Sequence, residues 1–351
     1  MNSGMSGGNP GVCGFEISSF AGFERRVLEL RNTNRDNPES LPYLEWRYTQ
    51  TSEAPPPRIF WLLSPGGDRI GMAAAIFRRY AIDGKLGIVA VIGDISVDAA
   101  WRGRALGAFL LGVMTRDLLA NFPGMPALVI PTDSARRALV RSGWIKGGRL
   151  HSWVHVLDGT RYIRPYVGER AARTLANCAR AASSWWTRRR IPEGARLEIL
   201  TGAAAALAGL APTPTLPGRV MRVASEEQWR WRYETHPRVT FRFARLSFGN
   251  APRAVLVFEQ ESTPRSATVY DLHAPDDADA RVLLAAFLLW GHQQRSLESV
   301  RFVIDGRHPL RKPLRALGFV RRKSDAVFQL RAADPRLTRL DWHLTQGDKD
   351  T

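Results

Sequence analysis

The period of the apolar residues changes within the stretch Val97-Asp98-Ala99-Ala100-Trp101-Arg102-Gly103-Arg104-Ala105-Leu106-Gly107-Ala108. The residues before it, 85–97, are mostly apolar, which predicts a strand. After it, apolar residues recur at helical spacing over 106–119, which predicts a helix. The stretch is therefore predicted to be a strand end, a turn of small residues and the first turn of a helix.

Such a turn is suited to bind a phosphate group. The first turn of a helix has N–H groups without partners inside the helix, and it lies at the positive end of the helix dipole. Small residues let a phosphate approach those N–H groups closely. Arg102 and Arg104 add positive charge beside them. The alternative is an ordinary strand–turn–helix connection that happens to be basic.

Outward from this turn, the pattern predicts one mixed α/β unit. Upstream, helices at 20–31 and 41–48 precede three strands of an antiparallel meander, at 58–63, 69–80 and 85–97. Downstream, a strand at 127–130 and a basic helix at 133–141, ended by Gly143, precede a last strand at 150–156.

With this context, the chain resembles the GCN5-related N-acetyltransferase (GNAT) superfamily. The coenzyme A loop of that superfamily reads Arg/Gln-x-x-Gly-x-Gly/Ala after a strand ending in Val, and this chain has Arg102-Gly103-Arg104-Ala105-Leu106-Gly107. Ala105 stands where the family prefers Gly, and a negative φ would accommodate it. The resemblance covers 40–157 well and 220–331 weakly. It implies acetyl-CoA or another acyl-CoA as co-substrate, and an amine as acceptor.

The resemblance also implies roles for individual residues. Main-chain groups of Ile95 and Val97 would pair with the pantetheine arm, and the thioester would lie where the strand 90–97 splays from 127–130. The pyrophosphate would be bound by main-chain N–H groups of Arg102, Gly103, Arg104, Ala105, Leu106, Gly107 and Ala108.

Two positions depart from the family pattern. A Tyr that often serves as acid to the leaving thiolate is replaced by Leu139. An Asn that commonly touches the cofactor is replaced by Thr132. The thiolate would then take its proton from water or another residue; alternatively, the protein only binds coenzyme A.

Three residues are candidates for acid–base catalysis, because the attacking amine must be neutral. Asp94 has the apolar neighbours Ile92 and Ile95, and we expect burial to raise its pKa. The alternative is a strand-end Asp that accepts backbone hydrogen bonds. His151 and His155 share one face of the closing strand. Each is a candidate for the base or for a substrate ligand, and the alternative is that they are surface residues. Two histidines without a third ligand predict no metal site.

The second half of the chain repeats the order of the first. The segment 229–233 (Trp-Arg-Trp-Arg-Tyr) matches 44–48 (Leu-Glu-Trp-Arg-Tyr), and a strand, a basic helix and a Gly-aromatic pair follow in both halves. Coincidence is the alternative to a diverged duplication. We predict the α/β (α+β) class, with two tandem GNAT-like domains, each a mixed, mostly antiparallel twisted sheet flanked by helices.

The second half lacks the phosphate loop. At the corresponding place, 274–280, three aspartates would repel a pyrophosphate and cap a helix instead. We therefore expect this half to be non-catalytic. The expected division of the chain is a disordered segment 1–14, an acyl-CoA-binding domain 15–158, a basic and Ala/Pro-rich linker 159–219, a degenerate domain 220–333 and a tail 334–351.

Charge and composition limit the partners. The net charge is +17, and the segment 159–191 holds eight Arg against one Glu, together with Trp185 and Trp186. Arg with Trp suits an anionic membrane surface; a solvated linker is the alternative. Signatures of nucleic-acid binding are missing from the sequence, so nucleic acid is not an expected partner. Two cysteines and the lack of a signal or long apolar run predict a cytoplasmic protein, with peripheral contact to the inner membrane face.

The leading hypothesis is an N-acyltransferase that moves an acyl group, acetyl first, from acyl-CoA to a primary amine. The helix 44–48 and the ending 341–348 also resemble acyltransferases of bacterial polysaccharide and cell-envelope biosynthesis, which implies an amino sugar as acceptor. The alternative is a non-catalytic module that senses acyl-CoA or binds nucleic acid or membrane. The oligomeric state stays open.

Overall fold

The computed structural model describes residues 14–33, 35–48, 53–262, 265–322 and 326–349. The segment expected to be disordered, 1–14, lies outside the described residues except for Gly14. The chain forms two compact units, and each is discontinuous in sequence. Unit 1 consists of Met1–Arg79, Gly87–Gly147 and Val327–Arg339; unit 2 consists of Tyr80–Leu86, Gly148–Ala326 and Leu340–Thr351.

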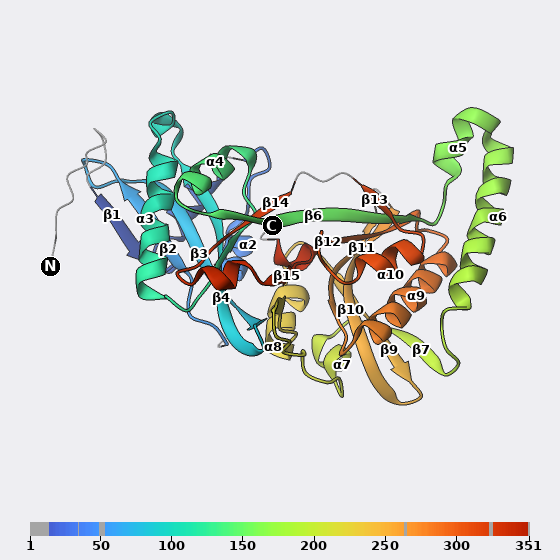
Figure 1. Cartoon of the computed structure of the whole chain (residues 1–351). Coiled ribbons are helices and arrows are strands. Elements are labelled where there is room, and N and C mark those ends of the chain that lie inside the picture. The colour runs from blue at the N-terminus through green and yellow to red at the C-terminus, as the bar shows by residue number, and fades with distance from the viewer. Residues whose placement is uncertain (1–13, 34, 49–52, 263–264, 323–325, 350–351) are drawn as a thin grey trace. The chain divides into compact units, whose positions relative to one another are not determined.

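Unit 1 is built on a sheet with the strand order β1-β2-β3-β4-β5-β14 (Figure 1). The strands are β1 (Gly14–Ser18), β2 (Arg58–Leu63), β3 (Arg69–Ile82), β4 (Lys85–Val97), β5 (Ala127–Val129) and β14 (Val327–Arg331). The pair β4–β5 is parallel, while β1–β2, β2–β3 and β5–β14 are antiparallel. The end of β3 and the start of β4 belong to unit 2.

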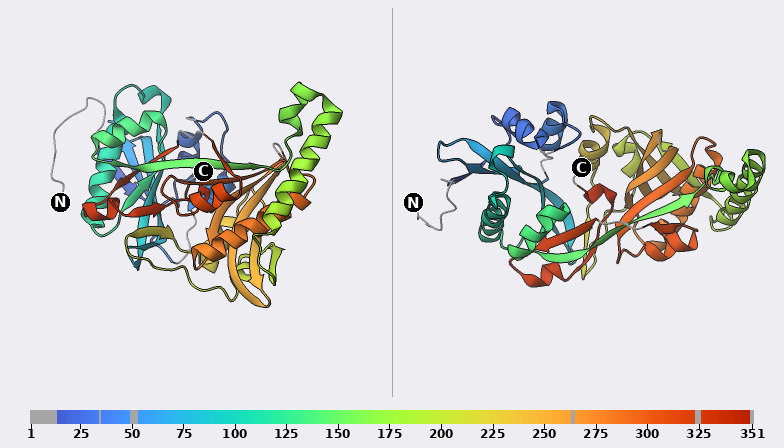
Figure 2. Two further views of the ribbon diagram at one scale, coloured as in Figure 1. Left: turned by 45° about the vertical axis from the view of Figure 1, so that its right-hand side comes forward. Right: turned by 90° about the horizontal axis from the view of Figure 1, so that it is seen from above.

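Helices cover both faces of this sheet. They are α1 (Glu24–Asn32), α2 (Leu41–Tyr48), α3 (Leu106–Asn121) and α4 (Asp133–Arg141), with the short 3₁₀ turns η1 (Ala99–Trp101) and η3 (Pro335–Thr338). The second view of Figure 2 shows α1 and α2 on one face and α3 and α4 on the other. The apolar stripe of α3, with Leu110, Met114 and Leu118, packs into one cluster with Phe60 and Phe77 of the sheet. This packing fixes where α3 begins, at the end of β4.

Unit 2 has a sheet of the same kind, with the order β6-β12-β11-β10-β9-β7. Its strands are β6 (Ile145–Val156, with 145–147 in unit 1), β7 (Ala195–Leu200), β9 (Phe241–Phe248), β10 (Ala251–Ser262), β11 (Arg265–His273) and β12 (Ser299–Asp305). Only β11–β12 is parallel among these neighbouring pairs. Shorter strands are β13 (Val320–Arg322), which pairs with β6, and β8 (Arg219–Arg222), which pairs with β15 (Asp341–His343) and the end of β3.

The segment expected to be a linker, 159–219, contributes elements to unit 2. It forms α5 (Thr160–Val167), α6 (Glu169–Arg188), β7 and α7 (Ala203–Leu207). The other helical elements of unit 2 are α8 (Glu226–Trp229), the π-turn η2 (Arg230–Glu234), α9 (Asp277–Gln293), α10 (Arg311–Ala316) and the 3₁₀ turn η4 (Gln346–Asp348). The basic helix α6 packs within unit 2 through small buried side chains such as Ala172 and Ala176. Its Arg180 donates to the carbonyl oxygens of Leu157 at 3.1 Å and Leu297 at 3.0 Å.

The two sheets share one plan, as the duplication predicts. In unit 1, α3 follows β4 and α4 follows the parallel strand β5; in unit 2, α9 follows β11 and α10 follows the parallel strand β12. The closing strands are paired differently from the sequence order. The long strand β6 of Figure 1 pairs with β12, and β14, from the second half, pairs with β5. Gly147 permits this path, because a Cβ there would collide with Phe328.

Candidate functional site

The predicted strand–turn–helix is present in unit 1. β4 ends at Val97, and Asp98 caps the following turn, its carboxylate accepting the N–H of Ala100 at 3.2 Å. Gly103 has φ of +80° and Ala105 has φ of +58°, and α3 begins at Leu106. The chain therefore reverses within a few residues and presents the start of a 16-residue helix at the end of β4.

The negative φ that would accommodate Ala at position 105 is not found, because φ of Ala105 is positive. It is the N-cap residue of α3 in the left-handed conformation, and its side chain supplies no capping hydrogen bond. An L-residue in this region costs about 1–2 kcal/mol, because Cβ lies too close to the following carbonyl oxygen. The backbone thus adopts at Ala105 the conformation for which Gly is preferred. In the first turn of α3, Leu106 is buried and Gly107 and Ala108 are partly exposed. The N–H of Ala108, one of the groups predicted to bind the pyrophosphate, already donates to the carbonyl oxygen of Ala105 at 3.1 Å.

The two arginines of the loop are held in different ways. Arg102 donates to the main-chain oxygen of Thr33 at 2.9 Å. The guanidinium of Arg104 lies over the ring of Trp101, 4.9 Å from its centroid. Both residues are exposed. Together with the helix N-terminus, they concentrate positive charge at this loop.

The strands β4 and β5 separate as the resemblance requires. They pair only over Ala90–Ile92 with Ala127–Val129. Two residues later Asp94 has φ of +53°, a positive value that bends β4 away from its previous course. Ile95 and Val97, both partly exposed, lie beyond this bend, outside the β4–β5 pairing. Their main-chain groups therefore do not take part in the β4–β5 pairing.

Asp94 is the centre of a buried ionic cluster. One carboxylate oxygen pairs with Arg31, and the other accepts from Arg47 Nε at 2.9 Å and from the Tyr48 hydroxyl at 2.7 Å. Arg35 lies 3.5 Å away. Burial alone would raise the pKa of Asp94, but Arg47 and Arg31, with the Tyr48 hydrogen bond, lower it to about 2.

The raised pKa expected for Asp94 is therefore wrong. A carboxylate with a pKa near 2 and both oxygens engaged holds no proton at neutral pH and accepts one poorly. Its charge instead neutralises Arg31 and Arg47, whose side chains are almost fully buried. Glu39 supplies the second carboxylate, 3.3 Å from Arg31. This arrangement ties α1 and α2 to the bend of β4.

Leu139 and Thr132 belong to the same unit as the loop. The Leu139 side chain is fully buried in the core that includes Leu111 and Trp144. It offers no proton donor. Thr132 is the N-cap residue of α4, exposed, with its hydroxyl 3.0 Å from that of Ser134.

The two candidate histidines, His151 and His155, lie in unit 2, whereas the phosphate loop lies in unit 1. His155 is buried with its Nε2 3.4 Å from the Ser183 hydroxyl, which is also 3.0 Å from Nε2 of His292. Burial lowers the pKa of His155 to about 4. His151 is partly exposed, and burial followed by the charge of Arg321 lowers its pKa. Both imidazoles are neutral at pH 7.

Unit 2 contains a counterpart of the Asp94 cluster that sequence reasoning missed. Asp271, near the end of β11, accepts from the Tyr233 hydroxyl at 3.0 Å and pairs with Arg222. Tyr233 and Tyr48 are the last residues of the matched motifs, and β11 matches β4. The signal was present in the repeated Trp-Arg-Tyr, which needed only an Asp on the corresponding strand.

The aspartates at the entrance of α9 act as predicted. Asp276 is the N-cap residue, and its carboxylate accepts the N–H of Asp279 at 2.8 Å. This confirms the capping role. Across the residues described, no three His, Cys, Asp or Glu side chains are placed to hold a metal ion. None of the helices in the described part of the chain has the length and apolar character to cross a membrane.

Comparison with solved structures identifies the fold. A GCN5-related N-acetyltransferase from Anabaena variabilis matches 92% of this chain and 74% of its own, with a TM-score of 0.60 and 11% identity. A probable N-acyltransferase from Enterococcus faecalis (93% and 74%, TM-score 0.61, 10% identity) and Eis1 from Mycobacterium abscessus (92% and 74%, TM-score 0.57, 14% identity) match similarly. No family model and no curated protein matches the sequence. The chain has the GNAT fold, mixed α/β with mostly antiparallel sheets.

Proposed function

We propose that this protein is an acyl-CoA-dependent N-acyltransferase whose donor site lies in unit 1. The observation that carries the proposal is the junction of β4 and α3. There, a bent strand leaves its neighbour β5 and runs into a basic, exposed turn and the partly exposed N-terminus of a helix. Such a junction offers main-chain partners for pantetheine and N–H donors for a pyrophosphate. Unit 2 has aspartates at the equivalent turn, so one donor site per chain is proposed.

For the acyl group, acetyl is the first choice, because two of the matching structures are named as N-acetyltransferases. For the acceptor, we propose a primary amine, with amino sugars tested first. The support for amino sugars is the resemblance of the segments 44–48 and 341–348 to acyltransferases of polysaccharide biosynthesis.

The proton of the attacking amine needs a route out of the site. Asp94 has a low pKa and no free oxygen, so we propose that it positions β4 and that a water path drains the proton. The thiolate would also take its proton from water, because Leu139 is an apolar core residue. An enzyme of this kind would need acceptors that are partly deprotonated at working pH.

The experiment is a titration of acetyl-CoA into the full chain, with release of free thiol measured in the presence of amino sugars and simple amines. We expect Gly107→Glu to weaken acetyl-CoA binding at least tenfold, about 1.4 kcal/mol, because it places a carboxylate beside the pyrophosphate. Gly124→Glu is the matched control: Gly124 lies on an exposed turn beyond the other end of α3, with open space around it. Equal affinities of the two folded variants would refute the donor site.

A non-catalytic acyl-CoA sensor is the second candidate, favoured by the core position of Leu139. Tight binding of acetyl-CoA with no thiol release on any amine would select it. A separate proposal concerns location: the exposed Arg and Trp side chains of α5 and α6 suit peripheral contact with an anionic membrane, and nucleic acid is not proposed as a partner.

A further inference from the structure

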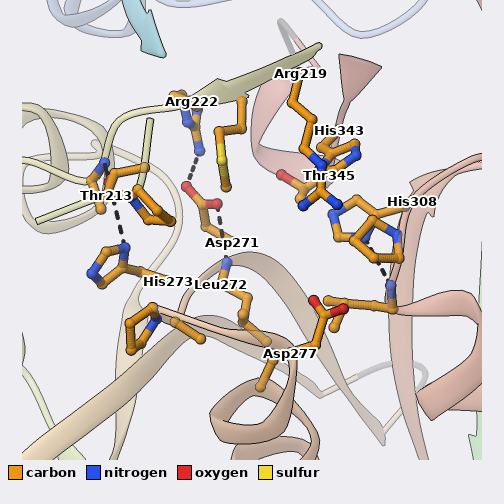
Figure 3. A pocket seen from close by; sticks show the side chains of 18 of the residues that line it. Thr213, Arg219, Arg222, Asp271, Leu272, His273, Asp277, His308, His343 and Thr345 are labelled. Atoms are coloured by element: carbon orange, nitrogen blue, oxygen red, sulfur yellow. Dashed lines mark hydrogen bonds and ion pairs between the residues drawn. The ribbon is translucent and has the colours of Figure 1, made fainter. Parts of the chain in front are cut away.

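Unit 2 contains a cavity of about 350 Å³ beside the end of β11 and the entrance of α9 (Figure 3). It occupies the place in the second half that corresponds to the donor site in the first. β11 and β12 pair only as far as Val269 and Phe302, so they separate as β4 and β5 do. A volume of this size is in the range of small-molecule sites.

The C-terminal segment closes the channel that pantetheine would need in this half. The N–H of Asp305 donates to the carbonyl of Leu344 at 3.0 Å, and Ile304 forms a bridge with Thr345. The chain itself therefore pairs with β12 where β11 has left it. What remains is a pocket, and the carboxylates of Asp276 and Asp277 at its edge disfavour a pyrophosphate.

Some polar groups on the pocket wall bind other protein groups and form its frame. Arg222 pairs with Asp271 and donates to the Gly347 carbonyl at 2.7 Å. His273 contacts the Ala211 carbonyl at 2.8 Å and the Thr213 hydroxyl at 3.4 Å. These groups have no free capacity for a strong ionic contact with a ligand.

Three charged side chains on the wall, those of Arg219, Asp276 and Asp277, form no ion pair with any residue that the structure describes. The Asp276 carboxylate caps α9. The side chains of Arg219, half-buried on β8, and of Asp277, exposed in the first turn of α9, also form no hydrogen bond with a described residue. Figure 3 shows the Arg219 side chain reaching toward Thr345 and the Asp277 carboxylate reaching up from α9 into the same pocket. Among the described residues, the pocket thus presents a cation and an anion, Arg219 and Asp277, whose side chains are not engaged.

Two neutral histidines near Arg219 add hydrogen-bond donors to the pocket wall. Nδ1 of His308 accepts the N–H of Leu310 at 3.2 Å, so its ring proton is on Nε2. His343 stacks obliquely on His308, with 5.1 Å between ring centroids, and burial lowers its pKa to about 4. A carboxylate beside Arg219 would find imidazole N–H donors without a second full charge. The remaining wall is apolar, with Pro214, Leu216, Met221, Leu272 and Leu310.

We propose that this pocket binds a small zwitterion with an apolar side chain, of the class of free α-amino acids. The carboxylate would pair with Arg219, the ammonium group would pair with Asp277, and the side chain would cover Met221 and Leu310. Each charge of the ligand meets an opposite charge that has no partner among the residues that the structure describes, so desolvation is compensated on both sides. The proposal concerns unit 2 and does not depend on acyl transfer in unit 1.

The test is a calorimetric titration of the full chain at pH 7.5 with three probes: L-norleucine, hexanoate, which lacks its amine, and pentylamine, which lacks its carboxylate. We expect norleucine to bind at least tenfold more tightly than either of the other probes. Equal affinity for one of the truncated probes, or no heat from norleucine at millimolar concentration, would overturn the proposal. This comparison uses the unaltered chain.

Two variants test which side chain binds each charged group of the ligand. Arg219→Gln and Asp277→Asn should each weaken norleucine binding at least tenfold, about 1.4 kcal/mol. Arg196→Gln, an exposed arginine on β7, and Glu193→Gln, an exposed carboxylate before it, remove the same charges away from the pocket and should leave binding unchanged. A loss of equal size in the control variants would show that only net charge matters and would reject the site.

Discussion

At the scale of single residues, Ala105 carries a measurable strain. Its φ of +58° costs an L-residue about 1–2 kcal/mol, whereas Gly adds about 0.5–1 kcal/mol of unfolded-state entropy. We therefore expect Ala105→Gly to raise the free energy of unfolding by up to about 1 kcal/mol, measured by urea denaturation. Ala108→Gly, three residues on within α3, should lower it by about 0.5–1 kcal/mol. The same sign in both variants would contradict a left-handed Ala105.

Substitution of Asp94 should lower the free energy of unfolding, whereas Ala105→Gly should raise it. Asp94→Asn removes the negative charge between Arg31 and Arg47, both buried, and should lower the free energy of unfolding by about 3–5 kcal/mol at pH 7. The control is Asp36→Asn at an exposed position, where little change is expected. Because the pKa of Asp94 is lowered, its stabilisation is present above about pH 3.8 and is lost as pH falls toward 2. Wild-type stability in Asp94→Asn would show that the cluster is not ionic.

These residues also show where sequence reasoning stops. The neighbours Ile92 and Ile95 correctly indicated that Asp94 is buried, but its partner Arg47 lies 47 residues away and on another element. A local pattern reports burial, whereas pKa depends on which charges the fold brings together. The same limit applies to His155, whose partner Ser183 lies in a segment that was read as a linker.

At the scale of elements, local periodicity was sufficient for most helices and strands. The strand 85–97 and the helices 41–48 and 133–141 have the bounds that the pattern predicts. Pairing is not local, so the partners of β6 and β14 could not be read from alternation alone. β7 and β9 were missed although charged residues alternate with apolar ones in both, most regularly in β7, and such alternation is typical of a half-buried strand.

The predicted contact with an anionic membrane concerns the helices α5 and α6. Trp185 and Trp186 are each 54% exposed, and Arg189 and Arg190 lie over their rings, 3.8 and 5.0 Å from the centroids. We expect the chain to sediment with vesicles that contain anionic lipid, and less at high salt. Changing both Trp to Ala should weaken this at least tenfold, whereas Leu86→Ala, an equally exposed apolar side chain elsewhere, should not. Binding to neutral vesicles with the same strength would contradict the charge argument.

At the scale of the whole molecule, comparing the two halves shows which features belong to the fold that they share. The Tyr–Asp pair occurs in both halves, as Tyr48 with Asp94 and as Tyr233 with Asp271, but the loop predicted to bind phosphate occurs only in the first. A pair that is kept without the loop serves the architecture common to both halves. In unit 1 it fastens α2 to β4, and in unit 2 it fastens η2 to β11. This supports a positioning role for Asp94.

The response of stability to acid also concerns the whole molecule, because the histidines are distributed unequally between the two units. All seven histidines of the chain lie in unit 2, and the pKa of each is lowered, with burial as the first cause. Four of them, His155, His236, His292 and His343, have values of about 4. In the unfolded chain these groups titrate near 6.5, so between about pH 6.5 and 4 the unfolded state binds more protons.

The free energy of unfolding should therefore be highest above about pH 6.5 and fall steadily toward pH 4. Each buried histidine contributes up to about 1.4 kcal/mol per pH unit in this window. Hydrogen exchange at pH 7 and pH 5, corrected for the intrinsic rate, locates the loss: protection should fall in β11, β12 and α9 and persist in β2, β3 and α3, because unit 1 contains no histidine. His292→Asn, which keeps a partner for Ser183 but cannot titrate, should flatten the decline. An equal loss of protection in both units would show that the acid response does not come from the histidines.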